Sequence, residues 1–253
     1  MIALITGASG GIGEELARIF TARRQDVVLV ARGREKLEAL SRELSTAHGV
    51  QAHVLAADLT DPACPGEVFR TVEEQGLTID VLVNNAGFGA RGAFADLDYE
   101  VQGRMIQLNI TTLTHLTRLF LPGMLERRTG KILNVASTAA FFPGPLMAVY
   151  YASKAYVVSF SEALAEEVRG TGVTVTALCP GATKTNFANV AGNAHSPLFK
   201  NAMDAQAVAL AGYDGLMAGE RMVVPGSSNK MTVFSSRLAP RAMLAKITRK
   251  LNS

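Results

Sequence analysis

The stretch IALITGASGGIGEELARIF, residues 2–20, decides the fold of this chain. A short apolar run is followed at once by a glycine-rich turn, TGASGGIG at 6–13, and then by a helical pattern. Glycines there let the backbone turn tightly, approach a pyrophosphate without an intervening Cβ, and pack the helix close to the strand. The N–H groups at the start of the helix then face the anion. The order strand, glycine turn, helix therefore predicts a dinucleotide site, and a plain loop is the alternative.

Outward from this stretch, apolar and β-branched runs alternate with helical patterns along the chain. Most of the runs are apolar at consecutive positions, as expected for strands buried on both faces of a parallel sheet. The alternation indicates right-handed βαβ units, and so an α/β fold with a doubly wound sheet and helices on both faces. The predicted strands are 2–6, 27–31, 52–57, 81–84, 131–136, 173–179 and 222–225.

Length and composition limit the architecture. A chain of 253 residues that is 48% hydrophobic can bury one large core, so we expect a single domain over 1–253. No apolar run reaches the roughly 18 residues of a membrane-spanning helix. The first residues, MIALITG, lack the basic stretch and the cleavage-like site of a signal sequence. We therefore expect a soluble, cytoplasmic protein.

Metal chemistry and nucleic-acid binding are not expected. The two cysteines, Cys64 and Cys179, and the four histidines show no ligand-like spacing. The net charge is only +3, although residues 230–253 alone hold six basic side chains and no acid. The positive charge therefore belongs to the C-terminal tail, and the chain as a whole lacks the basic footprint of a nucleic-acid-binding protein.

The end of the second strand indicates which cofactor the glycine turn would hold. A site for NAD normally has an acid there, about 20 residues after the turn, to bind the ribose 2′-hydroxyl. Here the sequence reads VARGR, and Asp26 lies at the wrong end of the strand. A 2′-phosphate could instead bind Arg32, because a guanidinium suits phosphate oxygens, so NADP is predicted over NAD. Arg34 is interpreted as a solvated loop residue. Asp58 is placed either to reach the adenine edge or to cap the next turn.

Five short motifs, taken together, resemble the short-chain dehydrogenase/reductase family. They are TGASGGIG at 6–13, NNAG at 84–87, Ser137, YxxxK at 150–154 and PG at 180–181. The resemblance covers nearly the whole chain. It implies a Rossmann-like domain with about seven parallel strands, hydride transfer between a nicotinamide and a carbonyl or alcohol, and often a dimer or tetramer. The chain looks most like members that reduce carbonyls on lipophilic substrates.

Carried over position by position, the resemblance implies two sets of functional residues. Asn84 and the NNAG turn would support the sheet beside the cofactor. The implied catalytic residues are Asn109, Ser137, Tyr150 and Lys154. The predicted cofactor-binding residues are Gly7, Ser9, Gly11, Ile12, Gly13, Arg32, Asp58, Leu59, Asn85, Ala86, Gly87, Tyr150, Lys154, Pro180, Gly181 and Thr183.

Two adjacent tyrosines, Tyr150 and Tyr151, are candidates for the acid. Free tyrosine has a pKa near 10, roughly three units above neutrality, so its phenolate needs a positive neighbour. Residues four apart share a helix face, so Lys154 lies beside Tyr150 and its ammonium favours the phenolate. Tyr151 points about 100° away around the helix and is interpreted as a packing or pocket-wall residue. Tyr150 is therefore the predicted proton donor, and Ser137 helps to hold the substrate oxygen.

Two of the four catalytic candidates have a structural alternative. Asn109 lies in a helix that is otherwise apolar on that side, where a structural asparagine with satisfied hydrogen bonds fits the residues alone. The family spacing implies instead that it holds a water that relays protons to Lys154. Ser137 follows a strand at the edge where open α/β folds place their sites, but a cap serine looks the same locally. A nucleophilic role for this serine is not expected, because no histidine and aspartate form a relay around it.

Three further segments concern the substrate and partners. Residues 139–149, AAFFPGPLMAV, either line a hydrophobic substrate pocket or pack in the core. Residues 184–203 have weak periodicity and are predicted to form a mobile lid. Arg91 is predicted to lie outside the site. The basic tail, 237–253, is predicted to form a helix that docks on protein, with weak contact to a membrane surface as the alternative. Its predicted apolar face consists of Met243, Leu244, Ile247 and Leu251.

The sequence therefore predicts an NADPH-dependent reductase or dehydrogenase that acts on a lipophilic ketone, aldehyde or 3-oxoacyl compound or on the corresponding alcohol. The expected assembly is a homodimer or homotetramer. One alternative is a non-catalytic NADP-binding regulatory protein, which need not keep Ser137, Tyr150 and Lys154 intact. The other is an epimerase or dehydratase that retains its nicotinamide, which the absence of a C-terminal substrate domain disfavours. The physiological substrate, the reaction direction and the stereochemistry are not determined by the sequence.

Overall fold

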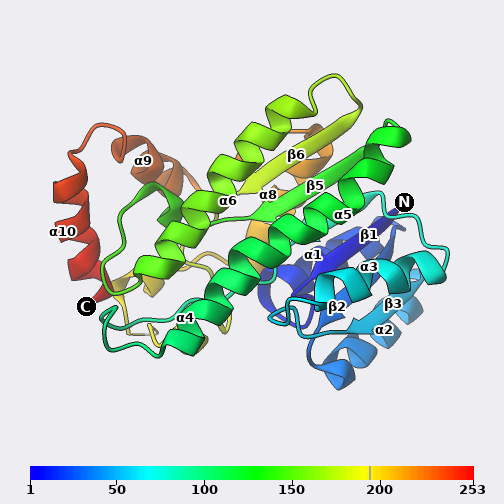
Figure 1. Cartoon of the computed structure of the whole chain (residues 1–253), viewed down its shortest axis with the longest axis horizontal. Helices are drawn as coiled ribbons and strands as arrows, with labels where there is room; N and C mark the ends of the chain where they lie inside the picture. The colour runs from blue at the N-terminus through cyan, green and yellow to red at the C-terminus, as the bar shows by residue number, and fades with distance from the viewer. Residues whose placement is uncertain (194) are drawn as a thin grey trace.

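The protein is described by a computed structural model over residues 1–193 and 195–253. Seven parallel strands form one sheet in the order β3-β2-β1-β4-β5-β6-β7 (Figure 1). The predicted α/β class with a doubly wound, Rossmann-like sheet is confirmed, and each strand ends within two residues of its predicted bounds. The strands are β1 (Ile2–Thr6), β2 (Asp26–Ala31), β3 (Ala52–Ala56), β4 (Val81–Asn84), β5 (Gly130–Val135), β6 (Val173–Leu178) and β7 (Met222–Val223).

Helices cover both faces of this sheet. One core cluster joins the sheet to α1, α2 and α8, and a second joins its other face to α3, α5 and α6. Figure 1 shows α5 and α6 running alongside each other across one face. The helices that cover the two faces are α1 (Gly11–Ala22), α2 (Arg34–His48), α3 (Cys64–Glu74), α5 (Leu113–Glu126), α6 (Ala148–Glu167) and α8 (Ala205–Ala218).

Strand β1 lies inside the sheet, between β2 and β4, and contributes side chains to both clusters. Ala3 and Ile5 face the cluster of α1, α2 and α8, whereas Leu4 faces the opposite cluster, and none of the three is exposed. Successive strand residues point to opposite faces, so a strand covered on both sides is apolar at consecutive positions. Because the strand order reverses between β1 and β4, the crevice of the fold opens beside the glycine turn that follows β1.

The helical segment from 99 to 126 contains a feature that the sequence pattern did not predict. Between α4 (Tyr99–Ile106) and α5 the chain forms a π-helical segment over Gln107–Thr112. A π-turn widens the helix locally and is frequent at functional sites. Asn109, one of the predicted catalytic residues, lies inside it.

The C-terminal part adds two helices at the end of the molecule away from β3 (Figure 1). They are α9 (Ser227–Ser235) and α10 (Arg241–Asn252). The predicted tail helix over 237–253 thus begins only at Arg241, because Pro240 has an extended backbone with ψ of 137°. Its predicted apolar face is divided: Leu244 is buried, whereas Met243 and Ile247 are exposed. Within the described residues no helix is long and apolar enough to cross a membrane.

Candidate active site

The glycine turn after β1 has a backbone that only glycines fit. Gly7 and Gly11 have φ of 67° and 59°, in the left-handed region that favours glycine. A Cβ on Gly13 would lie 2.4 Å from the carbonyl oxygen of Gly7 and 2.5 Å from Nδ2 of Asn85. Helix α1 begins at Gly11, so its first N–H groups are available to an anion beside this turn. The turn therefore fits the pyrophosphate of a dinucleotide, with Ser9 and Ile12 in the same turn.

Hydrogen bonds fasten the NNAG turn to this glycine turn. The hydroxyl of Thr6 accepts from the backbone N–H groups of Asn85, at 2.9 Å, and Ala86, at 3.0 Å. Nδ2 of Asn85 donates to the carbonyl oxygen of Thr6 at 2.9 Å. Asn85, Ala86 and Gly87 are thereby brought beside the predicted dinucleotide site from a position almost eighty residues away in the sequence.

Asn84 lies inside the sheet. Its Nδ2 donates to the hydroxyl of Thr117 at 3.0 Å and to Oδ1 of Asn134 at 2.9 Å. Asn134 in turn donates to Ser161 at 2.9 Å. This buried polar chain ties β4 and β5 to α5 and α6, which agrees with the supporting role that the family resemblance implies for Asn84.

The predicted adenosine end of the site carries positive charge. Arg32 is exposed at the end of β2, and Arg34 is exposed with its guanidinium 3.7 Å from Glu38. Burial alone would raise the pKa of Asp58, but hydrogen bonds from Thr60 and the charges of Arg32 and Arg104 lower it below its usual range. Asp58 accepts from both the N–H and the hydroxyl of Thr60, as in a capped turn. Asp58 thus makes the contacts of a capping residue, and its contact with adenine stays a prediction.

Leu59, predicted next to Asp58, is buried, and its carbonyl oxygen accepts from the hydroxyl of Thr112 at 2.7 Å. The loop after β3 is thereby held against the π-helical segment that carries Asn109.

Ser137 and Tyr150 meet at the carboxyl end of β5. Ser137 follows β5, and its Oγ accepts from the N–H of Ala139 at 3.1 Å, as a cap serine does. Tyr150, in the first turn of α6, is only 8% exposed. Burial raises the pKa of its phenol, and the Ser137 hydroxyl acts in the opposite direction. The pair therefore presents a protonated phenol at neutral pH beside a second hydroxyl.

Lys154 lies one helical turn after Tyr150, as predicted. Its Nζ is 5.9 Å from the centre of the Tyr150 ring and donates to the carbonyl oxygen of Val135 at 2.8 Å. Burial lowers the pKa of Lys154 to about 8. The ammonium form thus still dominates at neutral pH, and its charge favours the phenolate of Tyr150.

Asn109 and Gly87 lie next to this lysine. Oδ1 of Asn109 accepts from the N–H of Phe88 at 3.2 Å, and its Nδ2 donates to the Phe88 carbonyl at 3.0 Å and to Ser153 at 3.1 Å. A Cβ on Gly87 would lie 3.0 Å from Oδ1 of Asn109 and 3.4 Å from Nζ of Lys154. The side-chain amide of Asn109 is therefore fully hydrogen-bonded, as the structural alternative requires, and Gly87 lies closely packed beside both Asn109 and Lys154. The water relay that the family resemblance implies stays a prediction.

The predicted nicotinamide side is formed by the PG turn after β6. The carbonyl oxygen of Pro180 accepts from the N–H of Thr138 at 2.8 Å, which places this turn beside Ser137. The hydroxyl of Thr183 donates to the carbonyl oxygen of Gly181 at 3.0 Å. A Cβ on Gly181 would lie 2.4 Å from Oδ1 of Asn229, a close approach from α9 that no sequence pattern indicates.

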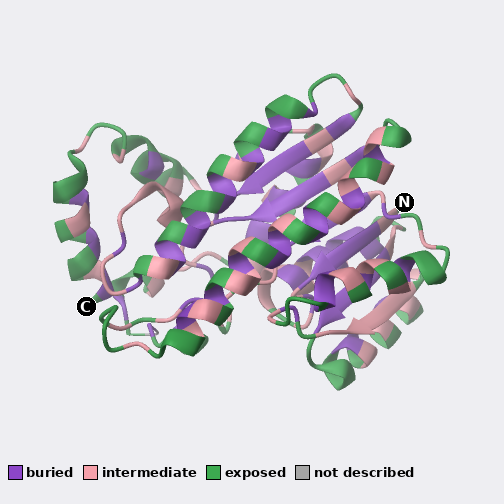
Figure 2. Cartoon of the chain, viewed as in Figure 1, coloured by how far each residue is buried: buried purple, intermediate pink, exposed green. Residues whose placement is uncertain are grey.

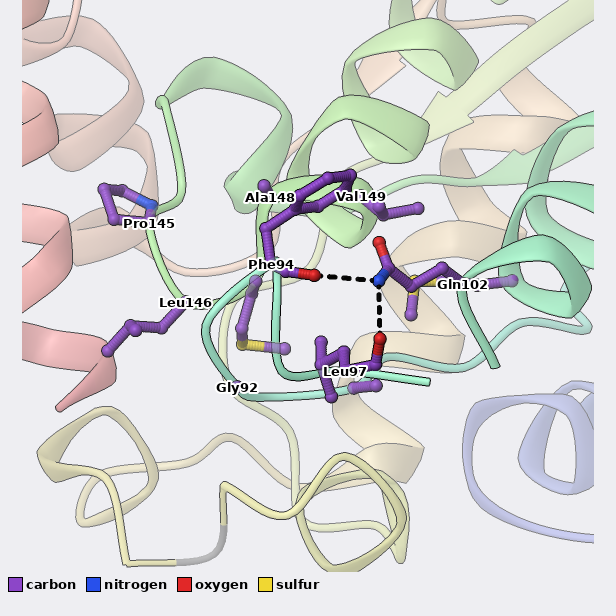
Figure 3. Close-up of a pocket in the computed structure, with 11 residues that line it drawn as sticks. Gly92, Phe94, Leu97, Gln102, Pro145, Leu146, Ala148 and Val149 are labelled. Atoms are coloured by element: carbon purple, nitrogen blue, oxygen red, sulfur yellow. Dashed lines mark hydrogen bonds between the residues drawn. The ribbon is translucent and has the colours of Figure 1, made fainter. Parts of the chain in front are cut away.

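An apolar pocket of about 150 Å³ lies between the loop after β4 and the start of α6 (Figure 3). It is bounded by the loop after β4 and by residues 145–149, part of the predicted substrate segment. The side-chain amide of Gln102 closes one wall by donating to the carbonyl oxygens of Phe94 and Leu97. Met147 lines the pocket and also packs in the cluster that contains Tyr150. The segment 139–149 thus both lines a pocket and joins the core.

The predicted lid covers Tyr150. The ring of Phe187, in α7 (Phe187–Val190), lies 5.2 Å from the ring of Tyr150. A Cβ on Gly89 would lie 3.0 Å from Phe187 and 3.2 Å from both Met147 and Tyr150, so this glycine allows the three side chains to meet. A Cβ on Gly11 of the glycine turn would lie 3.0 Å from Cγ2 of Thr185, so the segment also approaches this turn. Residue 194, within the predicted lid, lies outside the described residues.

The end of α10 is fastened to the segments around the pocket. Asn252 donates from Nδ2 to the carbonyl oxygen of Pro145 at 3.0 Å and accepts at Oδ1 from the hydroxyl of Tyr151 at 3.3 Å. Arg91 donates to the carbonyl oxygen of Asn252, and Ser196 donates to that of Leu251 at 2.7 Å. Tyr151 is a packing residue in this arrangement, and Arg91 has a structural partner. These contacts were not predicted, because they join segments 55 to 161 residues apart whose spacing carries no signal.

In the described part of the chain no group of three or more histidine, cysteine, aspartate or glutamate side chains is arranged to hold a metal ion. Burial raises the pKa of the Cys64 thiol to about 11 and that of the Cys179 thiol to about 12. Both thiols are free and stay protonated at neutral pH.

Comparisons with known proteins agree with this geometry. Residues 1–195 match a family model described as short chain dehydrogenase. The chain is 37% identical over 193 residues to very-long-chain 3-oxoacyl-CoA reductase of Anas platyrhynchos, a match that covers 74% of this chain and 61% of the relative. It is 38% identical over 188 residues to human 17-beta-hydroxysteroid dehydrogenase type 3, covering 72% and 59% respectively. The matches thus span about three fifths of these relatives.

One solved structure is similar over nearly its whole length. A short-chain dehydrogenase from Sphingobium yanoikuyae, in complex with NADPH, is 34% identical with a TM-score of 0.84. The likeness covers 94% of this chain and 93% of that one.

Proposed function

The chain belongs to the short-chain dehydrogenase family, and from this premise we propose that it is an NADPH-dependent reductase or dehydrogenase of lipophilic carbonyl compounds and alcohols. As a member it is an oxidoreductase that acts on CH–OH or C=O groups and uses a nicotinamide cofactor. One observation carries the proposal: Ser137, Tyr150 and Lys154 lie together at the carboxyl edge of the sheet, where the glycine turn also opens.

Each of these side chains has a task in carbonyl reduction. A reduced nicotinamide, held by the glycine turn and the PG turn, would supply the hydride that the carbonyl carbon accepts. The Tyr150 phenol, kept protonated by burial, gives its proton to the carbonyl oxygen, and the Ser137 hydroxyl donates a hydrogen bond to the same oxygen. The Lys154 ammonium stabilises the phenolate that remains. Asn109 lies close to Lys154, with Gly87 packed beside both, and as the family resemblance implies it would hold the water that passes solvent protons to Lys154.

The cofactor preference rests on Arg32. No carboxylate stands at the end of β2, where the sequence reads VARGR, and Arg32 is exposed there with its charge acting on Asp58. A guanidinium in that place binds a 2′-phosphate through charge-assisted hydrogen bonds. The NADPH complex of the Sphingobium enzyme supports the same choice.

Replacing Arg32 with Gln should shift this preference. We expect kcat/KM with NADPH to fall by roughly 10- to 100-fold, because a hydrogen bond to a charged group contributes about 1.5–3 kcal/mol. The kcat/KM with NADH should change less than about threefold. Arg34→Gln is the matched control, since that guanidinium is exposed two residues away beside Glu38. A wild-type enzyme that prefers NADH would contradict the role of Arg32.

The proposed substrate class rests on the pocket beside Met147. Its lining is mostly apolar, and the two sequence relatives are named for 3-oxoacyl-CoA and hydroxysteroid substrates. The test is a panel of ketones, aldehydes and 3-oxoacyl thioesters of increasing chain length, with consumption of NADPH followed by absorbance. We expect kcat/KM to rise with the apolar surface of the substrate. Tight NADPH binding without turnover on the whole panel would favour the regulatory alternative instead.

A cytoplasmic location and a homodimeric or homotetrameric assembly are also part of the proposal. Sedimentation velocity on the purified chain tests the assembly, and a monomer at micromolar concentration would contradict it.

A further inference from the structure

Helices α9 and α10, with the turn between them, expose an unusual amount of apolar surface. We refer to residues 227–252 as the C-terminal hairpin. Five large apolar side chains in it are between 45% and 76% exposed, and Figure 2 shows the outward sides of both helices as exposed. These side chains are Met231, Phe234, Leu238, Met243 and Ile247.

Three of these side chains belong to α9 and to the turn that follows it. Met231 and Phe234 are three residues apart, so they lie on one face of the helix, and Leu238 follows in the next turn. Val233, on the other side of α9, is buried against the protein. The exposed side of α9 therefore carries two large apolar side chains among serine and threonine residues, and neither side chain is buried against the described residues.

In α10 an apolar row and a basic row lie next to each other. Met243 and Ile247 are four residues apart and exposed, and so are Lys246 and Lys250. The buried row of α10, Leu244, Thr248 and Asn252, lies towards the protein. The outward side of α10 thus carries methyl-rich side chains flanked by ammonium groups.

The charge of the hairpin has a single sign. No aspartate or glutamate follows Glu220 in the sequence. None of the basic side chains from residue 230 onward forms an ion pair with a carboxylate of the described chain. These side chains are Lys230, Arg237, Arg241, Lys246, Arg249 and Lys250.

We propose that the C-terminal hairpin docks on an anionic phospholipid bilayer. Exposed apolar side chains enter the boundary between headgroups and acyl chains, while lysine and arginine beside them bind the anionic headgroups. A second copy of the chain fits the face less well, because an isologous pairing would bring two sets of unpaired cations together. A nucleic acid would satisfy the cations but leave the apolar side chains exposed to water.

The helix that would dock is also attached to the substrate side of the protein. The end of α10 is hydrogen-bonded to Pro145 and Tyr151, in the segments that border the pocket. This goes beyond the proposed reaction, and the docking surface itself does not depend on that reaction.

A tryptophan reporter tests the proposal directly, because the chain contains no tryptophan. In Phe234→Trp the reporter sits on the exposed face of α9, and in Leu210→Trp it sits at an exposed position of α8 as a control. With phosphatidylcholine vesicles that contain phosphatidylglycerol, we expect the emission of Phe234→Trp to shift to the blue and that of Leu210→Trp to stay unchanged. The shift should vanish with pure phosphatidylcholine and at 1 M salt, where the screening length falls to about 3 Å. No shift on anionic vesicles, or an equal shift on neutral ones, would overturn the proposal.

Charge and apolar variants separate the two contributions. By vesicle sedimentation we expect Lys246→Ser with Lys250→Ser to weaken binding at least about 10-fold, and Arg42→Ser with Arg70→Ser, on α2 and α3, to change it less than about twofold. Met243→Ser with Ile247→Ser should also weaken binding about 10-fold. The free energy of unfolding in urea should be unchanged in all three double variants, since every replaced side chain is exposed. If the apolar pair instead altered the oligomeric state and left vesicle binding intact, the face would join copies of the chain and the proposal would be wrong.

Discussion

Tyr150 and Tyr151 show how adjacent residues of one type acquire different tasks. Tyr150 is buried beside Ser137 and one helical turn from Lys154, so its phenol has a hydroxyl and an ammonium as neighbours. The ring of Tyr151 packs on Gly144, where a Cβ would lie 2.0 Å away, and its hydroxyl donates to Asn252. The chemistry expected of the first is proton transfer, and the second holds the end of α10.

The first prediction follows from this difference. Tyr150→Phe should lower kcat at least about 100-fold, because a positioned acid is lost, while the Kd for NADPH changes little. Tyr151→Phe should keep most of the activity, since it loses only the hydrogen bond to Asn252. Steady-state kinetics and a binding titration on both variants make the comparison. An inactive Tyr151→Phe beside an active Tyr150→Phe would reverse the assignment.

The second prediction concerns Lys154 and pH. Burial lowers its pKa from 10.5 to about 8, so between these values the unfolded chain binds more protons than the folded one. Stability attributable to this group therefore rises with pH through that window. Relative to Lys154→Met, the unfolding free energy of the wild type should increase by about 2 kcal/mol from pH 8 to pH 10, on a scale of about 1.4 kcal/mol per pKa unit.

Urea unfolding of both proteins without cofactor, at three pH values in this window, measures the difference. Tyr150, whose raised pKa acts in the opposite direction, is present in both proteins. If the difference in unfolding free energy between the wild type and Lys154→Met does not change with pH, the pKa of Lys154 is not lowered in the folded protein.

At the scale of elements, segments far apart in sequence close the site. The π-helical segment between α4 and α5 carries Asn109, whose side chain holds the backbone of Phe88 in the loop after β4. Helix α7 brings Phe187 over Tyr150, and the C-terminal end of α10 binds the loop that precedes α6. Each of these contacts depends on a loop or helix end, which is where such folds place their specificity.

The third prediction tests the attachment of α10. Asn252→Ala leaves the carbonyl oxygen of Pro145 and the buried hydroxyl of Tyr151 without a partner. Unsatisfied buried groups cost about 1–3 kcal/mol, so the unfolding free energy should fall by roughly 2 kcal/mol. Ser253→Ala is the control, because that hydroxyl is exposed and bonds only to Arg249 of the same helix. Equal stability of the two variants in urea would mean that the attachment contributes little.

At the scale of the whole molecule, the sheet gathers the functional groups at one edge. All strands are parallel, so the glycine turn after β1, the NNAG turn after β4, Ser137 after β5 and the PG turn after β6 end on the same side. A ligand held there contacts segments from the whole chain, and its binding is coupled to folding.

The fourth prediction uses this coupling. NADPH at about 100 times its Kd should raise the unfolding free energy of the wild type by about 2.7 kcal/mol. Gly13→Ala should lose most of this gain, because its Cβ would overlap the carbonyl oxygen of Gly7. Gly10→Ala should keep it, since nothing lies within 4 Å of a Cβ there. Equal gains in the two variants, measured by urea unfolding with and without NADPH, would show that the turn does not hold the cofactor.

The sequence by itself determined the fold class, the strands and the place of the glycine turn. Consecutive apolar residues in short runs indicate strands buried on both faces, and a glycine pattern between strand and helix has few other uses. The i and i+4 spacing is also sufficient to place Lys154 beside Tyr150 on one helix face. These signals are local, because they depend on residues within one or two turns of one another.

Only the tertiary structure decided which distant residues complete and cover the site. Asn229 beside Gly181, Phe187 over Tyr150, and Asn252 between Pro145 and Tyr151 are joined by packing across the fold. The sequence pattern predicts one apolar face for the tail helix. Packing of α10 against the rest of the protein buries Leu244 of that face and leaves Met243 and Ile247 exposed. Helical periodicity shows which residues share a side of a helix, whereas the surface against which that side packs is set by the rest of the chain.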